Sequence, residues 1–182
     1  MRLGKLLVLG AVTLGVSLLF TPSGSRASDE GKPPSAARLE HGAPSIDKLI
    51  DDFVQAINDR DKARLRQLRV TQEEYVALIL PGSVEPGQRR PMYNQEEVEY
   101  LWGILNGKSI YAEAGLLASF GGHHATVTEK DFRKGVKKYA DYTAYKQLTL
   151  TLKDDKGTEA TMRIGSIAEV DGQFKFISYV RD

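Results

Sequence analysis

The C-terminal part of the chain, from Tyr142 to Asp182, constrains the fold most strongly, because apolar and polar residues alternate there. Alternation with a period of two is typical of β-strands that bury one face. Four residues from Asp154 to Gly157 separate the first strand from the second, and Asp171-Gly172 separates the second from the third. Asp-Gly between alternating segments is a strong hairpin signal and favours a type I′ turn. The sequence therefore predicts a three-stranded antiparallel meander.

The same alternation predicts which side chains share a face of the sheet. In the first of these strands, one face holds Tyr142, Ala144, Lys146, Leu148, Leu150 and Leu152. In the last strand, Phe174, Phe176, Ser178 and Val180 share a face, and Ile177 and Tyr179 lie on the opposite one. The pattern slips at Gly165-Ser166, which indicates a bulge or a bend. A basic segment, residues 125–138, is expected to add a strand before the meander.

Amphipathic helices precede these strands. Apolar residues recur with helical spacing after Ser45, after Thr71 and after Asn94, and Asp61 to Arg69 forms a shorter helix. Ser45 is a good N-cap, and Thr71 with Glu74 matches a capping box. The glycine in Asn106-Gly107 is expected to weaken or divide the last helix. Helices followed by an antiparallel meander predict an α+β fold, with N-terminal amphipathic helices packed on the concave face of a bent antiparallel β-sheet.

Residues 1–27 are interpreted as a signal peptide. Arg2 and Lys5 precede a 15-residue, mainly apolar run from Leu6 to Phe20, which is too short to span a bilayer. Residues 28–44 are rich in Ser, Pro and Gly and are predicted to form a disordered tether, and residues 45–182 a single α+β, cone-like domain. We therefore expect an exported, periplasmic or extracellular protein, with no stable membrane span after cleavage of the signal.

Composition narrows the possible functions. Cleavage of residues 1–27 would change the net charge from +1 to −2, so charge gives no argument for nucleic-acid binding. The absence of cysteine excludes a thiol nucleophile and thiolate metal ligands. His123 and His124 would point to opposite faces of an extended segment, which argues against a shared metal ion. The adjacent acids Asp51 and Asp52 are assigned to the solvated face of a helix. No catalytic residue, metal site or cofactor is predicted.

The order of elements and the final hairpin, VDGQFKFISYVRD, are similar to those of the cone-shaped fold of nuclear transport factor two, SnoaL-like cyclases and ketosteroid isomerase. The resemblance covers residues 45–182 and is to small exported bacterial proteins of that kind. For the enzymes of this fold it implies an aspartate base and a tyrosine or acid that line the cone. Asp141 and Tyr142 match no such motif, so no catalytic residue is carried over.

Three functional hypotheses remain open. The first is a non-enzymatic domain that binds a small apolar ligand or a partner in a pocket under the helices, lined by Trp102, Tyr142, Lys146 and Ser178. The second is a pocket enzyme of the isomerase, cyclase or hydrolase type, which needs a buried carboxylate or histidine. The third is an interaction module that forms a homodimer through the sheet face of Ile177 and Tyr179.

Overall fold

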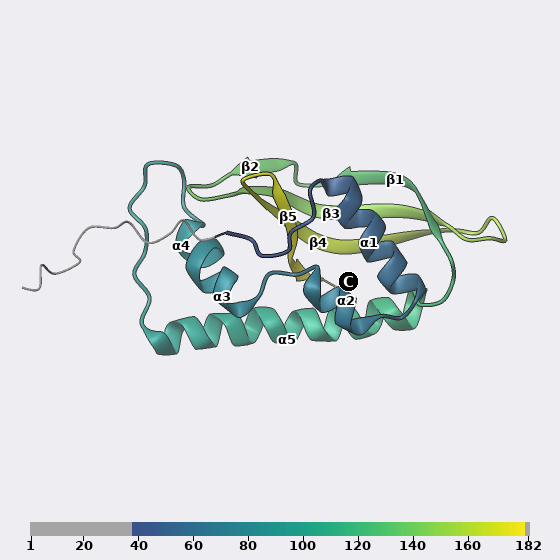
Figure 1. Cartoon of the computed structure of the whole chain (residues 1–182), viewed down its shortest axis with the longest axis horizontal. Coiled ribbons are helices and arrows are strands. Elements are labelled where there is room, and N and C mark those ends of the chain that lie inside the picture. Colours follow the sequence, from purple (N-terminus) through teal and green to yellow (C-terminus); the bar gives the residue numbers. More distant parts are fainter. Residues whose placement is uncertain (1–37, 181–182) are drawn as a thin grey trace, which may run out of the picture. The chain divides into compact units, whose positions relative to one another are not determined.

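The computed structural model describes residues 38–180, and these form helices followed by a five-stranded antiparallel sheet (Figure 1). The predicted α+β class is confirmed. The helical elements are α1 (Ile46–Asn58), α2 (Lys62–Gln67), α3 (Gln72–Glu74), the π-helical turn η1 (Tyr75–Ile79), α4 (Leu80–Gly82) and α5 (Gln95–Phe120). The strands are β1 (Thr126–Phe132), β2 (Val136–Lys138), β3 (Thr143–Lys153), β4 (Glu159–Val170) and β5 (Gln173–Tyr179).

The meander has the predicted connectivity. The order of strands is β1-β3-β4-β5, and β2 pairs with the other end of β3 on the side of β1. The segment predicted as one strand is thus divided into β1 and β2, because Gly135 between them takes a φ of +64°. Asp171 and Gly172 both have positive φ, as a type I′ turn requires, and the predicted hairpin between β4 and β5 is confirmed.

The helix starts also follow the sequence signals. The Ser45 hydroxyl accepts a hydrogen bond from the Lys48 amide at the start of α1. The predicted capping box of Thr71 with Glu74 forms before α3, and Asn94 with Glu97 forms a second one before α5. The expected division near Gly107 does not occur, since α5 continues for 26 residues.

The core consists of two clusters that lie on opposite faces of the sheet. In the first cluster, α1 and the C-terminal half of α5 cover residues of β3, β4 and β5, including Leu148, Leu150, Met162, Ile164, Ile167 and Phe176. In the second cluster, η1 and the N-terminal half of α5 cover Tyr142, Ala144, Ala168 and Val170. Neighbours in a strand point to opposite faces. Ile167 and Ala168 belong to different clusters, so both faces are covered at this end of the sheet.

The predicted face of β3 is therefore wrong in part. Tyr142 and Ala144 belong to the second cluster, whereas Leu148, Leu150 and Leu152 belong to the first. The cause is an irregularity in the pairing of β3 with β4, which shifts between Tyr145 and Leu148 and again after Leu148. An extra residue in one strand reverses the faces beyond it.

The faces predicted for β5 are also corrected. Pairing between β4 and β5 shifts between Ser166 and Ile167, and this shift brings Tyr179 to the same side as Phe176. Both aromatic rings contact Phe53 of α1, at centroid distances of 5.5 and 5.2 Å. Tyr179 is buried and Ile177 packs against the second cluster, so neither lies on an open face of the sheet.

The predicted signal peptide, residues 1–27, and residues 28–37 of the predicted tether lie outside the described residues. Residues 38–44 belong to the folded domain, which begins earlier than predicted. Leu39 and Ala43 are buried, and Ala43 exchanges two backbone hydrogen bonds with Phe174 of β5, each 2.9 Å long. Within residues 38–180, no helix is sufficiently long and apolar to cross a bilayer.

Candidate functional site

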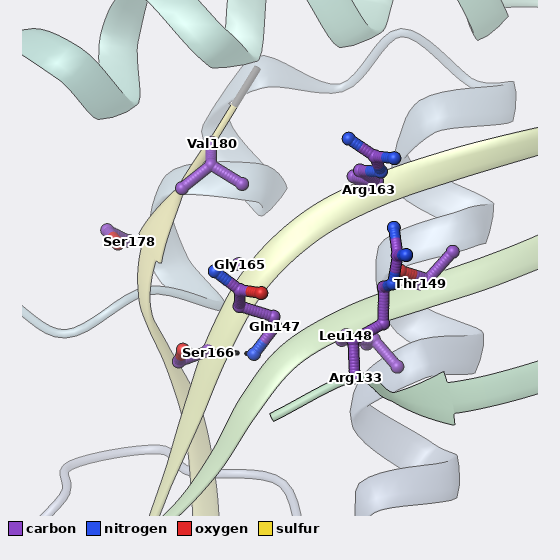
Figure 2. A pocket seen from close by; sticks show the side chains of 9 residues that line it. All are labelled: Arg133, Gln147, Leu148, Thr149, Arg163, Gly165, Ser166, Ser178 and Val180. Atoms are coloured by element: carbon purple, nitrogen blue, oxygen red, sulfur yellow. Dashed lines mark hydrogen bonds between the residues drawn. The ribbon is translucent and has the colours of Figure 1, made fainter. Parts of the chain in front are cut away.

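A hollow of about 290 Å³ lies where the irregular parts of β3, β4 and β5 meet (Figure 2). Its wall combines polar and cationic side chains with two apolar ones, namely Arg133, Gln147, Leu148, Thr149, Arg163, Ser166, Ser178 and Val180, together with Gly165. Figure 2 shows Ser166 and Ser178 at one side of the hollow and the two arginines with Thr149 at the other. The site is thus built by the three consecutive strands of the meander, with Arg133 contributed by the residues after β1.

Two unusual backbone conformations shape this hollow. Gly165 has a φ of +138°, and a Cβ atom there would collide with the backbone carbonyl oxygen of Ser178. Gln147 has a φ of +58°, which is uncommon for a residue with a side chain, and its backbone N–H donates a 3.2 Å hydrogen bond to the Ser166 hydroxyl (Figure 2). Such conformations are retained where surrounding structure enforces them, and they cluster at functional sites.

Cationic groups flank one threonine at the right of Figure 2. Thr149 of β3 pairs in register with Arg163 of β4, and Arg133 follows β1 and donates its amide to the carbonyl of Gln147 at 3.2 Å. Asp131 of β1 is the register partner of Thr149 on the other side and makes the local charge less positive. Guanidinium groups suit carboxylate, sulfate and phosphate oxygens because their donors form a planar fork.

The wall of the hollow contains a buried hydroxyl, that of Thr149. Its oxygen is buried, and it has no hydrogen-bond partner among the residues that the structure describes. A buried polar group left without a partner costs about 1–3 kcal/mol, so native structures rarely keep one unless water or a ligand completes it. Thr149 lines the hollow, so a small molecule held there would lie close to this hydroxyl.

The four residues predicted to line a pocket do not converge. Ser178 does line the hollow. Lys146 precedes Gln147 in the chain but is not part of the wall, and its backbone pairs with Lys134 and Gly135. Trp102 and Tyr142 both belong to the region of the second cluster.

Tyr142 and Trp102 have packing partners that account for their positions. The Tyr142 hydroxyl lies 2.8 Å from the Ser83 hydroxyl, and its ring stacks on Tyr139 at a centroid distance of 4.9 Å. Burial raises the pKa of Tyr142 to about 12, so it is protonated at neutral pH. Trp102 contacts Tyr75, and the Arg69 guanidinium lies 5.7 Å from the centre of the indole ring.

The interior also contains charged groups, each with an opposite charge nearby. Lys175 donates to both carboxylate oxygens of Glu74, at 2.8 and 2.9 Å, and both side chains are buried. Glu113 lies 3.8 Å from the Arg66 guanidinium. Burial raises the pKa of Tyr179, whose hydroxyl donates to the carbonyl of Leu65 at 2.6 Å. These contacts indicate that the buried charged groups have a structural role in the fold.

The three histidines lie at the surface of the domain. His41, His123 and His124 are exposed, and His41 and His124 each have a positive φ. Among residues 38–180, no group of three or more His, Asp or Glu side chains is arranged to hold a metal ion.

Sequence reasoning missed most of the hollow. Arg133 lies in the basic segment, residues 125–138, that the sequence predicts as a strand, and no functional role was predicted for Arg163. The slip at Gly165-Ser166 was the available signal, since a bulge redirects the side chains beside it. The second irregularity, at Gln147, involves no glycine, so the sequence does not indicate it.

Comparisons with protein-family models, with curated proteins and with solved structures found no match to this chain.

Proposed function

We propose that this is a non-enzymatic domain that binds a small molecule bearing an anionic group in the hollow between β3, β4 and β5. The observation that carries the proposal is the buried, unpartnered hydroxyl of Thr149 beside Arg133 and Arg163. Two guanidinium groups and a hydroxyl donor would match a carboxylate, sulfate or phosphate group. Ser166 and Ser178, across the hollow, would contact the uncharged remainder of the ligand.

A polar ligand in this hollow fits the observations better than an apolar ligand under the helices. The space beneath α1 is occupied by the contacting rings of Phe53, Phe176 and Tyr179. The wall of the hollow, in contrast, offers several hydrogen-bond donors and only two apolar side chains, Leu148 and Val180.

Binding is also favoured over catalysis. A pocket enzyme of the predicted kind requires a carboxylate or histidine at the site. The wall of the hollow includes neither, and the buried Glu74 and Glu113 are both close to cations.

Export remains part of the proposal. Its support is the sequence of residues 1–27, with a basic start, a short apolar run and a small-x-small pattern at Ser25 to Ala27. The resemblance to the nuclear-transport-factor-two-like fold is consistent with helices that precede a bent antiparallel meander. That fold serves many activities, so the proposal rests on the site.

The proposal is tested by NMR titration of the ¹⁵N-labelled protein with succinate and inorganic phosphate, and with uncharged succinamide as the matched control. We expect amide shifts at Gln147, Thr149 and Ser166, with a Kd of roughly 1–10 mM, corresponding to about 3–4 kcal/mol. Succinamide should cause no saturable shift. Equal binding of succinamide and succinate, or shifts that cluster elsewhere, would show that the proposal is wrong.

Substitutions distinguish binding of the anion in the hollow from a general effect of the protein's net charge. Arg133→Gln and Arg163→Gln should each weaken binding about fivefold to tenfold, since a charged hydrogen bond at an exposed site contributes about 1 kcal/mol. Asp131→Asn should strengthen binding, because it removes the neighbouring negative charge. Arg89→Gln, in the exposed loop before α5, changes the net charge equally and should have no effect. If Arg89→Gln weakens binding as much as Arg133→Gln does, the anion is not held in the hollow.

A further inference from the structure

The outward face of α5 is apolar and exposed over most of its length. Tyr100 and Tyr111 are each 69% exposed, and Ile104 is 39% exposed. With 100° per residue these three lie within about 40° of one another, and Gly107 lies about 20° to the other side of Tyr100. The side of the helix toward the core carries Ser109, Ala112 and Leu116. From residue 100 to residue 118, the middle of the outward face has no charged residue.

We infer that this face of α5 binds a second copy of the same chain, with the two α5 helices antiparallel. Ile110 lies at the margin of this face, and Met92 and Tyr93 in the loop before α5 are also exposed, beyond the acidic first turn with Glu96 and Glu97. Buried aromatic residues contribute about 150–250 Å² each, so burial of these six side chains would remove roughly 600 Å² per copy. Stable interfaces bury about 800 Å² per partner, so the face has nearly the required size.

The sizes of the side chains favour the antiparallel arrangement. If the twofold axis passes between Gly103 and Ile104, Tyr100 of one copy lies across from Gly107 of the other. A Cβ atom at Gly103 or Gly107 would meet no atom within 4 Å, so both positions leave room on the helix surface. Large side chains opposite small ones allow two helices to approach closely, and a twofold interface repeats each such contact.

The charges at the margin favour the same arrangement. Glu97 and Lys108 are both exposed and lie on the same flank of the apolar face, because 11 residues correspond to about three helical turns. In an antiparallel pair, residues on the same flank meet across the interface. Glu97 of each copy then lies near Lys108 of the other, whereas a parallel pair would place them about 16 Å apart along the axis.

The oligomeric state of the full chain gives the first test. Sedimentation equilibrium should show twice the mass of one chain at micromolar concentration. Gly107→Glu should weaken association at least about 100-fold, since a charge at the centre of an interface has no partner there. The substitution replaces a helix-weakening glycine where there is space, so the fold should be retained, as far-UV circular dichroism will show. A monomeric wild-type chain, or a dimer unaffected by Gly107→Glu, would overturn the inference.

Cross-linking tests the orientation separately. The chain contains no cysteine, so a single introduced cysteine reports on one position. Ile104→Cys lies beside the proposed twofold axis and should form an intermolecular disulfide under mild oxidation. Ala118→Cys is on the same face, but its counterpart would be about 40 Å away, beyond the reach of a disulfide. Equal cross-linking at both positions would indicate parallel helices, and none at Ile104→Cys would indicate another interface; either result contradicts the inference.

Discussion

The buried ion pair of Lys175 and Glu74 gives the sharpest prediction about stability. Glu74 accepts four hydrogen bonds: two from Lys175, one from the Thr71 amide at 2.8 Å and one from the Glu40 amide at 2.6 Å. It thereby joins residue 40, the start of α3 and β5. Lys175→Met keeps the aliphatic part of the side chain and removes the ammonium group, so Glu74 is left buried without its countercharge.

The expected cost follows from burial. The side chains of Lys175 and Glu74 are 4% and 5% exposed. Removing one partner of a buried pair costs about 3–5 kcal/mol, because the remaining charge has lost its solvent and its partner. For a domain of this size, 1 kcal/mol corresponds to roughly 2–4 °C in Tm, so a decrease of about 10 °C is expected. The double variant Glu74→Gln with Lys175→Met should lose less than the sum of the two single variants.

Urea denaturation followed by circular dichroism measures these free energies. Lys48→Met is the matched control, because Lys48 pairs with Asp52 on the surface, where its side chain is 55% exposed. Loss of that pair should cost at most about 0.5 kcal/mol. If Lys175→Met costs no more than Lys48→Met, or if the double variant is additive, then the buried pair is not what fixes α3 against β5.

Two further predictions concern other positions. Gly165→Ala should destabilise the domain by about 3 kcal/mol or more in urea denaturation, because φ is +138° and the new Cβ atom would collide with the Ser178 carbonyl oxygen. Gly172→Ala lies in an open turn with a φ of +74°, and its cost should be only about 1–2 kcal/mol. A similar cost for both would contradict this explanation. Tyr142 has a pKa of about 12 in the fold against 10 in the unfolded chain, so its contribution to stability is complete below pH 10 and is lost as the pH rises toward 12. The unfolding free energy of Tyr142→Phe should therefore fall less steeply over this pH range, and equal slopes would refute the assignment.

Local signals in the sequence determined the elements of this protein. A hydroxyl or amide side chain before an amphipathic segment satisfies free amides at a helix start, as at Ser45, Thr71 and Asn94. Asp171-Gly172 tolerates the positive φ of a tight hairpin. These effects involve residues a few positions apart, so they are visible in the sequence alone. Of the candidate site, sequence reasoning found Ser178 and the slip at Gly165.

Tertiary structure decided the rest, because the interactions join residues that are distant in the chain. Glu74 and Lys175 are 101 residues apart, and nothing in the sequence around either residue indicates that the two will pair. Gln147 has a positive φ although it is not a glycine, so the sequence does not indicate the irregularity there. Because of that irregularity, Tyr142 and Ala144 lie on the opposite face of the sheet from Leu148. The hollow exists only where that irregularity meets Gly165 and β5. Alternation therefore determined that strands form, and the pairing of those strands determined which side chains gather around Thr149.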